Sequence, residues 1–304
     1  MRLEIRNLTK TYGNVTALDN FNAVLGEGIY GVLGPNGAEK STLINILTDN
    51  IRRDAGEILL DGQEVLKMGA AYRRIVGYMP QEQVFYPQFT LLEFLKYMAL
   101  VKGLDHKDKA VRTQIEELLE ELHLADAAKR KLGGFSGGMK RRAVLAQALL
   151  GNPGIIILDE PTAGLDPKER IAMRNLISRL AEGRIVILAT HIASDIECIA
   201  DRVLLIKHGM LIKNENPFAL LDEVRGHIRR IYCKREELAA YQKQYRMSNC
   251  IQTKDGLTLH VIDPDYEGDK MVDATLEDVY LYYFEGMTVQ DHRDSPDRDL
   301  NSCG

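Results

Sequence analysis

The chain has 304 residues, of which 45% are hydrophobic and 27% are charged, and its formal net charge at pH 7 is −5. This composition is typical of a globular protein with a sizeable core, and the acidic balance argues against nucleic-acid binding. The four scattered cysteines form no C-x-x-C pair, which indicates reduced cytosolic thiols rather than a disulfide framework or a zinc site. The N-terminal segment lacks the apolar stretch of a signal peptide, and no apolar run is long enough to cross a membrane.

The pattern of apolar and polar residues predicts an α/β fold. Short strands are expected between residues 2 and 33, and a helix is expected from Ser41. A capping-box sequence at Thr90 opens a stretch of helical periodicity, which we interpret as a helical insert. Further downstream, branched apolar runs are typical of strands buried on both faces of a parallel sheet. The other expected elements are strands at 56–62, 75–81, 155–159 and 184–191, helices at 108–122, at 141–150 and from 166, and a hairpin at 202–214.

The sequence changes character after about residue 217. Strands are expected at 228–233, 250–253 and 257–262, with helical segments at 236–245 and 275–284, and together they predict a small separate α/β unit. The polar end of the chain is expected to be disordered. We therefore expect a first domain at 1–215 with a helical subdomain at about 83–135, an accessory domain at 216–288 and a disordered tail at 289–304. The accessory domain can be a regulatory or dimer-stabilising module, or equally a structural appendage.

A glycine-rich segment follows the apolar strand that ends at Leu33. A strand, such a turn and a Lys-Ser pair that opens a helix are typical of a phosphate-binding loop, in which backbone N–H groups and the helix dipole face the phosphates. Lys40 adds a positive charge, and the Ser41 hydroxyl can reach a magnesium ion. The segment consists of Gly34, Pro35, Asn36, Gly37, Ala38, Glu39, Lys40, Ser41 and Thr42.

Polar side chains also end several of the predicted strands, and ligands bind at the carboxyl edge of open α/β sheets. Asp159 and Glu160 close a buried apolar strand, so one carboxylate can hold magnesium and the next can polarise a water molecule. Gln81 and His191 each end another strand. Taken singly, the acidic pair is more typical of solvated strand ends, and the histidine of an ordinary loop.

Three more features are ambiguous by themselves. Ser136, Gly137 and Gly138 stand at the start of a helical pattern and can form a second anion site. The basic run 140–142 is interpreted as a solvated helix face, with phosphate or membrane contact as the alternative. Tyr12 lies beside a glycine and is, taken singly, a turn residue rather than a residue that stacks on a ligand base.

In this order, and over about residues 1–215, these motifs resemble those of the ATP-binding cassette (ABC) ATPases. The resemblance implies a P-loop NTPase core with an antiparallel β subdomain and a helical insert, which binds ATP and Mg²⁺ and hydrolyses ATP. In that likeness residues 34–42 are the Walker A loop, 135–139 the signature motif (with Phe135 in place of the usual leucine) and 164–166 the D-loop. The implied catalytic residues are Lys40, Gln81, Glu160 and His191, the implied magnesium ligands are Ser41, Gln81 and Asp159, and the implied ATP contacts are Tyr12, residues 34–42, Ser136, Gly137 and Gly138.

The resemblance also implies partners. In the family, the signature of one cassette closes over ATP held by another, so a second cassette is expected, in a homodimer or a heterodimer. The chain has one cassette and no membrane span, so it is expected to power a separate transmembrane permease from the cytoplasmic face of the membrane. Phrases at 136–142, 190–197 and 276–280 are similar to those of bacterial ABC-2-type exporter subunits. The alternatives are a catalytically degenerate or regulatory cassette and a soluble ABC protein outside transport.

Glu39 departs from the Walker A pattern, which has glycine before the lysine. A carboxylate about 4 Å from a phosphate charge is repelled by about 4 kcal/mol at an effective dielectric constant near 20, equivalent to about a thousandfold in affinity. We therefore expect weak ATP binding and slow hydrolysis. The penalty falls if the side chain rotates into solvent or binds a cation.

Overall fold

The computed structural model describes residues 1–35, 38–82, 86–263, 266 and 273–285. The chain separates into two compact units, residues 1–217 and 218–304, and each is described by itself. Both units combine sheets with helices, which confirms the predicted α/β class. The expected disordered tail at 289–304 lies outside the described residues.

A six-stranded sheet forms the centre of the first unit. The strands from β9 to β6 run parallel, and only β10 pairs in the antiparallel sense. The inner strands β7 and β8 of this sheet are buried along almost their whole length, and this burial on both faces explains why their sequences are uninterrupted apolar runs. In spatial order the strands are β10 (Met210–Glu215), β9 (Arg202–Lys207), β3 (Gly28–Leu33), β8 (Ile185–Ala189), β7 (Ile155–Asp159) and β6 (Val76–Met79).

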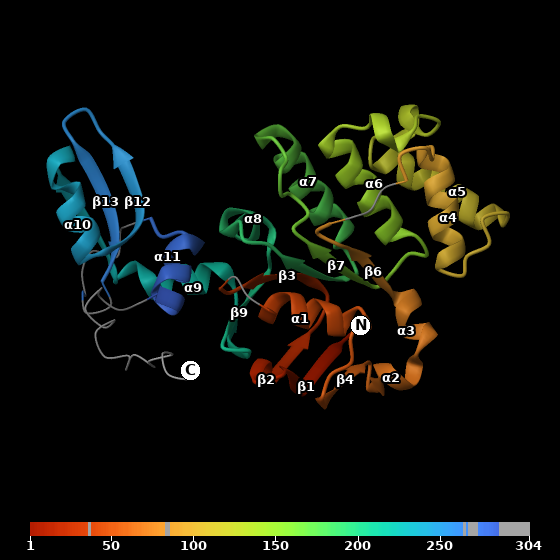
Figure 1. Ribbon diagram of the computed structural model, residues 1–304, viewed down its shortest axis with the longest axis horizontal. Helices are drawn as coiled ribbons and strands as arrows, with labels where there is room; N and C mark the ends of the chain where they lie inside the picture. Colours follow the sequence, from red (N-terminus) through yellow and green to blue (C-terminus); the bar gives the residue numbers. More distant parts are fainter. Residues whose placement is uncertain (36–37, 83–85, 264–265, 267–272, 286–304) are drawn as a thin grey trace, which may run out of the picture. The chain divides into compact units, whose positions relative to one another are not determined.

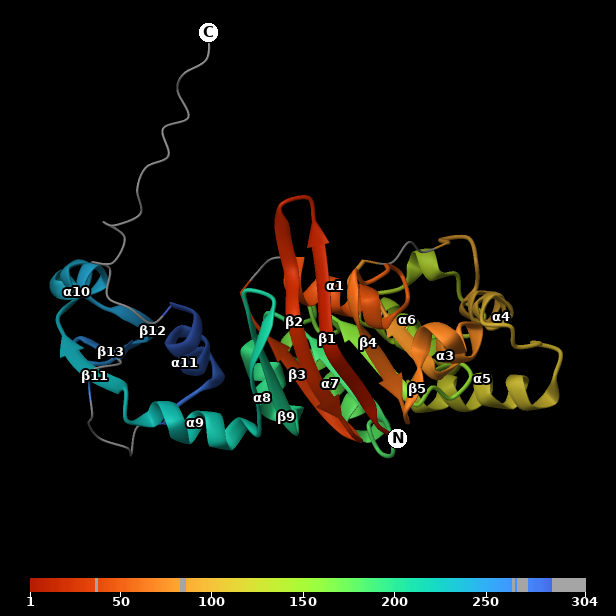
Figure 2. The ribbon, with the colours of Figure 1, turned by 90° about the horizontal axis from the view of Figure 1, so that it is seen from below.

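A second, antiparallel sheet of the first unit is built around one long hairpin (Figure 2). The prediction of short strands before residue 33 was wrong here, because β1 has 10 residues and β2 has 11. Their pairing shifts register after Ile5 and again after Leu8, and these irregularities break the two-residue period that the sequence analysis relied on. In spatial order the strands are β2 (Val15–Leu25), β1 (Leu3–Tyr12), β4 (Ala55–Leu60) and β5 (Gln63–Glu64).

Helix α1 (Ala38–Leu47) packs between the two sheets (Figure 1). Leu43, Ile44 and Leu47 are buried in one apolar cluster with residues of both sheets. The helix begins three residues before the expected Ser41, so the first turn already contains Glu39 and Lys40. The other face of the six-stranded sheet is covered by α7 (Pro167–Leu180) and α8 (Ala193–Ile199).

The predicted helical insert consists of α4 (Leu91–Val101) and α5 (Lys109–Glu121), beside α6 (Gly137–Leu149). The capping box at Thr90 is confirmed, because its hydroxyl accepts from the Glu93 N–H and the Glu93 carboxylate accepts from the Thr90 N–H. Helix α6 begins at Gly137 rather than at the predicted Arg141. The remaining helices of this unit are α2 (Val65–Met68), α3 (Ala70–Ile75), η1 (Ala125–Ala127) and η2 (Leu132–Gly134).

The second unit contains a three-stranded antiparallel sheet in the order β11-β13-β12. In Figures 1 and 2, α10 and α11 lie on opposite sides of this sheet. The edge strand β12 begins at Arg246, four residues before the predicted start, because a polar stretch gives no apolar signal there. The elements are α9 (Pro217–Arg225), β11 (Ile228–Cys233), η3 (Arg235–Glu237), α10 (Leu238–Gln244), β12 (Arg246–Gln252), β13 (Leu257–Ile262), α11 (Leu276–Tyr280) and η4 (Leu281–Glu285).

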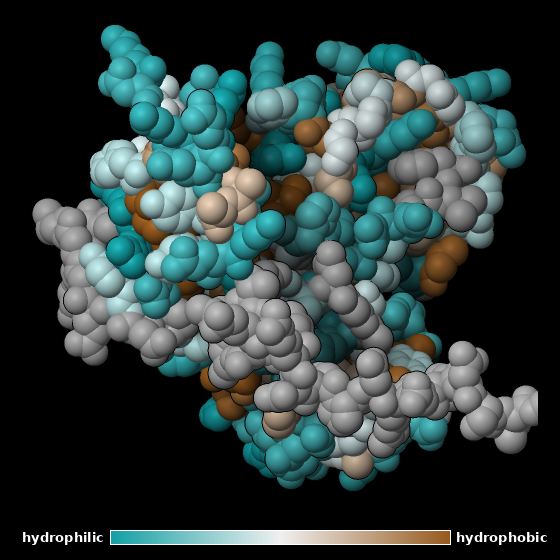
Figure 3. Space-filling model, turned by 60° about the vertical axis from the view of Figure 1, so that its left-hand side comes forward, coloured by the Kyte–Doolittle hydropathy of each residue, from teal (hydrophilic) through white to brown (hydrophobic). Residues whose placement is uncertain are grey.

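The face of the molecule drawn in Figure 3 carries mostly hydrophilic side chains, with apolar ones in separate small areas. Within the described part of the chain, every helix is too short or too polar to traverse a bilayer.

Candidate functional site

The predicted polar residues meet at one edge of the six-stranded sheet. Strands β3, β8 and β7 are parallel neighbours, so their carboxyl ends lie side by side. The loop to Lys40 leaves β3, Glu160 follows β7, and His191 follows β8. Residues that are far apart in the sequence therefore share one site.

The ammonium group of Lys40 lies against its own loop. It donates to the carbonyl oxygen of Gly34 at 2.5 Å and to that of Pro35 at 3.0 Å. Burial lowers the pKa of Lys40, and the charges of Glu160, Glu39 and Asp159 act in the opposite direction. Gly34 is needed at the base of this loop, because a Cβ there would stand 2.5 Å from the carbonyl oxygen of Ile206. Asn36 and Gly37, predicted to contact ATP, lie outside the described residues, and Ala38 is the first residue of α1.

Glu39 turns toward the hairpin between β9 and β10. Its Oε1 accepts a hydrogen bond of 3.0 Å from the backbone N–H of Gly209. Its Oε2 is buried and has no hydrogen-bond partner among the described residues. The alternative of a side chain rotated into solvent is therefore wrong, and the alternative of a bound cation stays a prediction.

Asp159 and Glu160 form a close acidic pair. Burial, with a smaller contribution from the charge of Glu160, raises the pKa of Asp159 to about 6. The charges of Arg141 and Lys40 oppose this shift. Asp159 is half-buried, and its carboxylate makes no hydrogen bond to another described residue. It is therefore an oxygen ligand without a protein partner, near a lysine.

The Glu160 carboxylate, in contrast, is held by the end of β8. Its Oε1 accepts from the backbone N–H of His191 and from Nδ1 of the same residue, both at 2.8 Å, and its Oε2 accepts from the Thr190 hydroxyl at 3.0 Å. A carboxylate only accepts, so the ring bond requires the proton on Nδ1. Glu160 also has a φ of +51°, a strained conformation for a side-chain-bearing residue, stabilised by its N–H bond to the Ala189 carbonyl.

A second buried network, formed by a hydrogen bond and an ion pair, involves the segment that follows Glu160. The Thr162 hydroxyl donates to the carboxylate of Asp195, which is 1% exposed and forms a 3.2 Å ion pair with Arg174. The network ties the segment after Glu160 to α7 and α8. Sequence analysis missed it together with Thr190. An aspartate inside a helical pattern beside apolar neighbours was the one available signal, because such a carboxylate needs a partner.

The interpretation of residues 140–142 as a solvated basic face was wrong for two of them. Arg141 donates to the carbonyl oxygens of Gln81 at 3.0 Å and Ala163 at 3.4 Å, and burial lowers its pKa. Arg142 forms a 2.7 Å ion pair with Glu169. The pattern of charges alone did not show that the N-terminal part of α6 faces the sheet edge and α7. Arg141 links two segments that both border the acidic pair.

Of the other predicted site residues, Thr42 and Gly138 are buried, whereas Tyr12, Ser41, Gln81, Ser136 and Gly137 are exposed. Ser136 is the N-cap of α6 and accepts from the Met139 N–H at 3.2 Å, which leaves the backbone N–H groups of Gly137 and Gly138 in the first turn of the helix. Tyr12 lies near α1, where its hydroxyl is 3.5 Å from that of Thr42. Ser41 and the side chain of Gln81 are exposed.

The donor set fits a magnesium-bound nucleoside triphosphate. Magnesium is usually held by one or two protein oxygens together with phosphate oxygens, so a single unpaired carboxylate (Asp159) and the exposed Ser41 hydroxyl suffice. Among the described residues no three His, Cys, Asp or Glu side chains are grouped to hold a metal without such a ligand. The first turn of α1 and Lys40 supply positive potential for phosphate, and Glu39 is the one group that does not fit.

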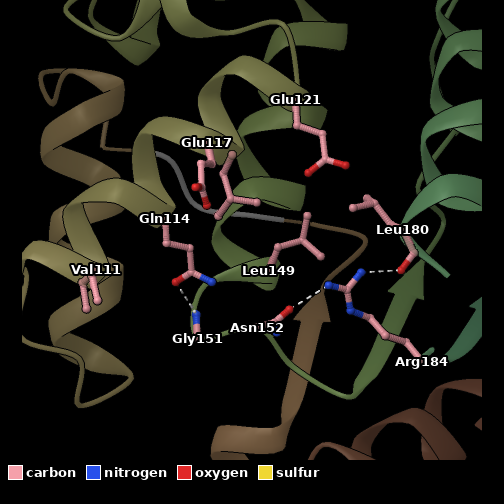
Figure 4. A pocket seen from close by; sticks show the side chains of 11 residues that line it. Val111, Gln114, Glu117, Glu121, Leu149, Gly151, Asn152, Leu180 and Arg184 are labelled. Atoms are coloured by element: carbon pink, nitrogen blue, oxygen red, sulfur yellow. Dashed lines mark hydrogen bonds between the residues drawn. The ribbon is translucent and has the colours of Figure 1, made fainter. Parts of the chain in front are cut away.

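A pocket formed by described residues lies elsewhere, between α5, the end of α6 and α7 (Figure 4). It measures about 530 Å³. Its polar groups bond to one another, since Gln114 accepts from the Gly151 N–H and Arg184 donates to Asn152. Because it lies at the amino edge of the sheet, away from Lys40 and Glu160, we do not assign the site chemistry to it.

Comparisons with known proteins agree with this geometry. A sequence profile of the ABC transporter family matches residues 18–163. The chain is 35% identical over 308 residues to the Nod factor export ATP-binding protein I of Burkholderia orbicola, and the alignment covers 95% of this chain and 98% of that relative. It is similar to a solved ATP-binding subunit of an ABC transporter, with 28% identity, a TM-score of 0.64 and coverage of 74% of this chain and 92% of the other. It is also similar to a dimeric ATP-binding cassette solved in a post-hydrolysis state with ADP and Pi, with 28% identity, a TM-score of 0.62 and coverage of 70% and 98%.

The raised pKa of Asp159 predicts a pH-dependent effect of its replacement. With a folded-state pKa of about 6 against an ordinary 3.8, this group stabilises the fold at acidic pH and loses that contribution as pH rises through 6. Asp159→Asn is therefore expected to raise the free energy of unfolding by about 2 kcal/mol at pH 7, after allowance for solvent screening, and by less than half of that at pH 4.5. Urea unfolding at both pH values measures this.

Asp255→Asn, in the exposed turn between β12 and β13, is the matched control and is expected to give the same small change at both pH values. An Asp159→Asn effect that is equal at pH 7 and pH 4.5 would contradict the assignment of a raised pKa to this carboxylate.

Proposed function

Because this chain belongs to the ABC transporter family of ATP-binding proteins, we propose that it is the ATP-hydrolysing subunit of an exporter whose membrane-spanning subunit is a separate chain. One observation carries the proposal. The Glu160 carboxylate is fixed by Thr190 and His191 at the same sheet edge as Asp159 and the loop of Lys40. The direction of transport is supported by the relative whose name describes export and whose length this chain covers almost completely.

In this proposal each group has one task. Bound ATP and Mg²⁺ supply the scissile phosphate and neutralise its oxygens. Lys40 and the first turn of α1 hold the phosphates, Ser41, Gln81 and Asp159 provide metal ligands, and Tyr12 offers its ring to the base. Glu160 acts as general base, because Oε2 accepts only one hydrogen bond and keeps a lone pair for a water proton. His191 orients that carboxylate through Nδ1.

The site is completed by a second cassette. Ser136 and the N–H groups of Gly137 and Gly138 cap a helix of 13 residues, and the Ser136 side chain is exposed. Such a helix start suits the phosphates of ATP held by a partner cassette. Such a helix start can face the ATP of a partner cassette in a homodimer or in a heterodimer. A solved neighbour with ADP and Pi is described as dimeric.

We further propose that residues 1–215 are the nucleotide-binding domain, with the helical subdomain at about 83–135, and that 216–288 form an accessory domain. The subunit would act at the cytoplasmic face of the membrane. The helical subdomain carries an aromatic cluster formed by Tyr86, Phe89 and Tyr97, with ring centroids 5.2 to 6.1 Å apart. Tyr86 and Tyr97 are 39% and 42% exposed, so the cluster offers an apolar contact to a partner, and we assign it to the permease.

Glu39 is proposed to impair nucleotide binding. Its carboxylate is adjacent to Lys40 and is fixed by Gly209, so the negative charge stays at the loop even without a nucleotide. Lys40 in turn bonds to the loop carbonyls, and these bonds have to break before the ammonium group can hold a phosphate. The same observation supports the second candidate function, a cassette that binds its partners but hydrolyses ATP poorly.

Replacing Glu39 is expected to strengthen ATP binding. Glu39→Gly removes both charge and bulk and should lower the Kd for Mg-ATP by between tenfold and about a thousandfold, whereas Glu39→Gln removes the charge alone and should recover part of that gain. Titration of the full chain with Mg-ATP measures it. Glu120→Gln, on the exposed face of α5, is the control. Equal affinity of wild type and Glu39→Gly would sink the proposal.

Glu160→Gln is expected to lower the rate of ATP hydrolysis at least about 100-fold and to leave the Kd for ATP within a few-fold, because the amide oxygen keeps the two bonds from His191 but accepts no proton. Phosphate release should be measured in the wild-type background and in Glu39→Gly, so that slow turnover stays measurable. Hydrolysis above half of the parent rate in Glu160→Gln would refute the general-base assignment. No hydrolysis in any parent chain would favour the second candidate.

A tagged chain is expected to retain a polytopic membrane protein when it is purified from detergent-solubilised membranes of its own cells. Tyr97→Ser should reduce this retention, because it removes an exposed ring of the aromatic cluster. Tyr232→Ser, an exposed tyrosine of the second unit, is the matched control and should not reduce it. Retention that is unaffected by Tyr97→Ser would argue against this docking surface, and no retained membrane protein would argue against a transport role.

A further inference from the structure

The sheet of the second unit packs against α10 on one face, and its other face, on the side of α11, borders a pocket and is called the open face. Residues of β11 and β13 at alternate positions pack with α10 in a small apolar cluster that contains Cys233, Leu257, Leu259 and Val261. The two-residue period therefore directs Arg230, Tyr232, Thr258 and His260 to the opposite face. In the observed register Arg230 pairs with His260, and Tyr232 pairs with Thr258.

A register shift in β12 extends this open face across all three strands. Met247 pairs with Val261, whereas Asn249 pairs with His260, so Ser248 is the extra residue of a bulge. Beyond the bulge, Asn249 and Ile251 stand on the same side as His260 and Thr258. The open face thus has two rows that cross the sheet: Arg230, His260 and Asn249 in one, and Tyr232, Thr258 and Ile251 in the other.

A pocket of about 400 Å³ lies over these rows. Its other wall comes from the segment that leads into α11, with Asp273, Thr275, Glu277 and Asp278. Every residue that lines it belongs to the second unit. The volume suits a small metabolite rather than a macromolecule.

Asp278 is the feature that points to a ligand. Its side chain lines the pocket, yet the residue is only 1% exposed. Its Oδ2 accepts from the N–H and the hydroxyl of Thr275, at 2.8 and 2.9 Å, while Oδ1 is buried and has no hydrogen-bond partner among the described residues. Leaving such an oxygen unpaired is unfavourable, and an N–H donor in the pocket would remove that cost once the carboxylate turns toward it.

The charged side chains around the pocket indicate which other charged groups the ligand carries. Arg230 is exposed and has no ion pair within the part of the chain that the structure describes. A guanidinium without a partner matches a carboxylate in bidentate geometry. The pocket is lined by three carboxylates, those of Asp273, Glu277 and Asp278, and by the one guanidinium of Arg230. It therefore favours ammonium groups over additional anions.

We propose that this pocket binds a free α-amino acid, with preference for a basic side chain. The carboxylate pairs with Arg230, the α-ammonium group donates to Oδ1 of Asp278, and the second positive charge lies near Asp273 or Glu277. The apolar chain of the ligand rests on Tyr232 and Ile251, which are 75% and 46% exposed. This site is independent of ATP binding and of the proposed function.

Calorimetric titration of the full chain tests the proposal with lysine, ornithine, leucine, glutamate, butylamine and butyrate. Lysine or ornithine is expected to bind at least tenfold more tightly than leucine, and leucine more tightly than butylamine or butyrate, because only the amino acids engage both Arg230 and Asp278. Absence of binding by all six compounds at millimolar concentration, or tighter binding of glutamate than of lysine, would overturn it.

Two variants locate the site. Asp278→Asn keeps an acceptor for Thr275 but replaces one carboxylate oxygen by an amide donor, and Arg230→Gln changes an exposed side chain. Each is expected to weaken lysine binding at least tenfold, whereas Asp255→Asn in the β12–β13 turn should not change it. If Asp278→Asn fails to fold, Arg230→Gln alone decides, and unchanged lysine affinity in it refutes the site.

Discussion

The hydrogen bonds between the Glu160 carboxylate and the end of β8 are the constraint on which the candidate site depends. They join two segments that leave neighbouring strands, and they hold a backbone conformation that glutamate adopts at a cost. Because β7 and β8 are buried on both faces, the edge they share cannot shift without disturbing the core. The position of the carboxylate is therefore set by the sheet and not by the loop that bears it.

Charge is concentrated at this edge. Asp159, Glu160 and Glu39 surround one lysine, and Arg141 is the next cation that acts on the acidic pair. Burial of a carboxylate next to another is unfavourable in the free protein, as the raised pKa of Asp159 shows, and a divalent cation relieves that strain. The same arrangement makes the additional negative charge of Glu39 unfavourable, although the Gly209 N–H stabilises one of its oxygens by a hydrogen bond.

A buried carboxylate oxygen without a partner has a different consequence in each of the two units. Within the part of the chain that the structure describes, Oε2 of Glu39 and Oδ1 of Asp278 are both buried without a hydrogen-bond partner. At Glu39 the orphaned oxygen belongs to a residue that stands where the family pattern has glycine, so the cost opposes the nucleotide site. At Asp278 the orphaned oxygen borders a pocket with an unpaired arginine, so a ligand with an N–H donor can recover the cost.

The sequence by itself determined the fold class, the family and the list of motif residues, because these depend on local order: strand, glycine-rich turn, helix, and carboxylates after an apolar run. It also located Thr90 as a helix cap, since capping is a contact within four residues. Only the tertiary structure decided the partners of those residues. The bonds of Glu160 to His191, of Arg141 to Gln81 and of Glu39 to Gly209 join positions separated by 31, 60 and 170 residues, and no local pattern encodes such distances. The orphaned oxygen of Asp278 is of the same kind, because burial and the lack of a partner are properties of packing.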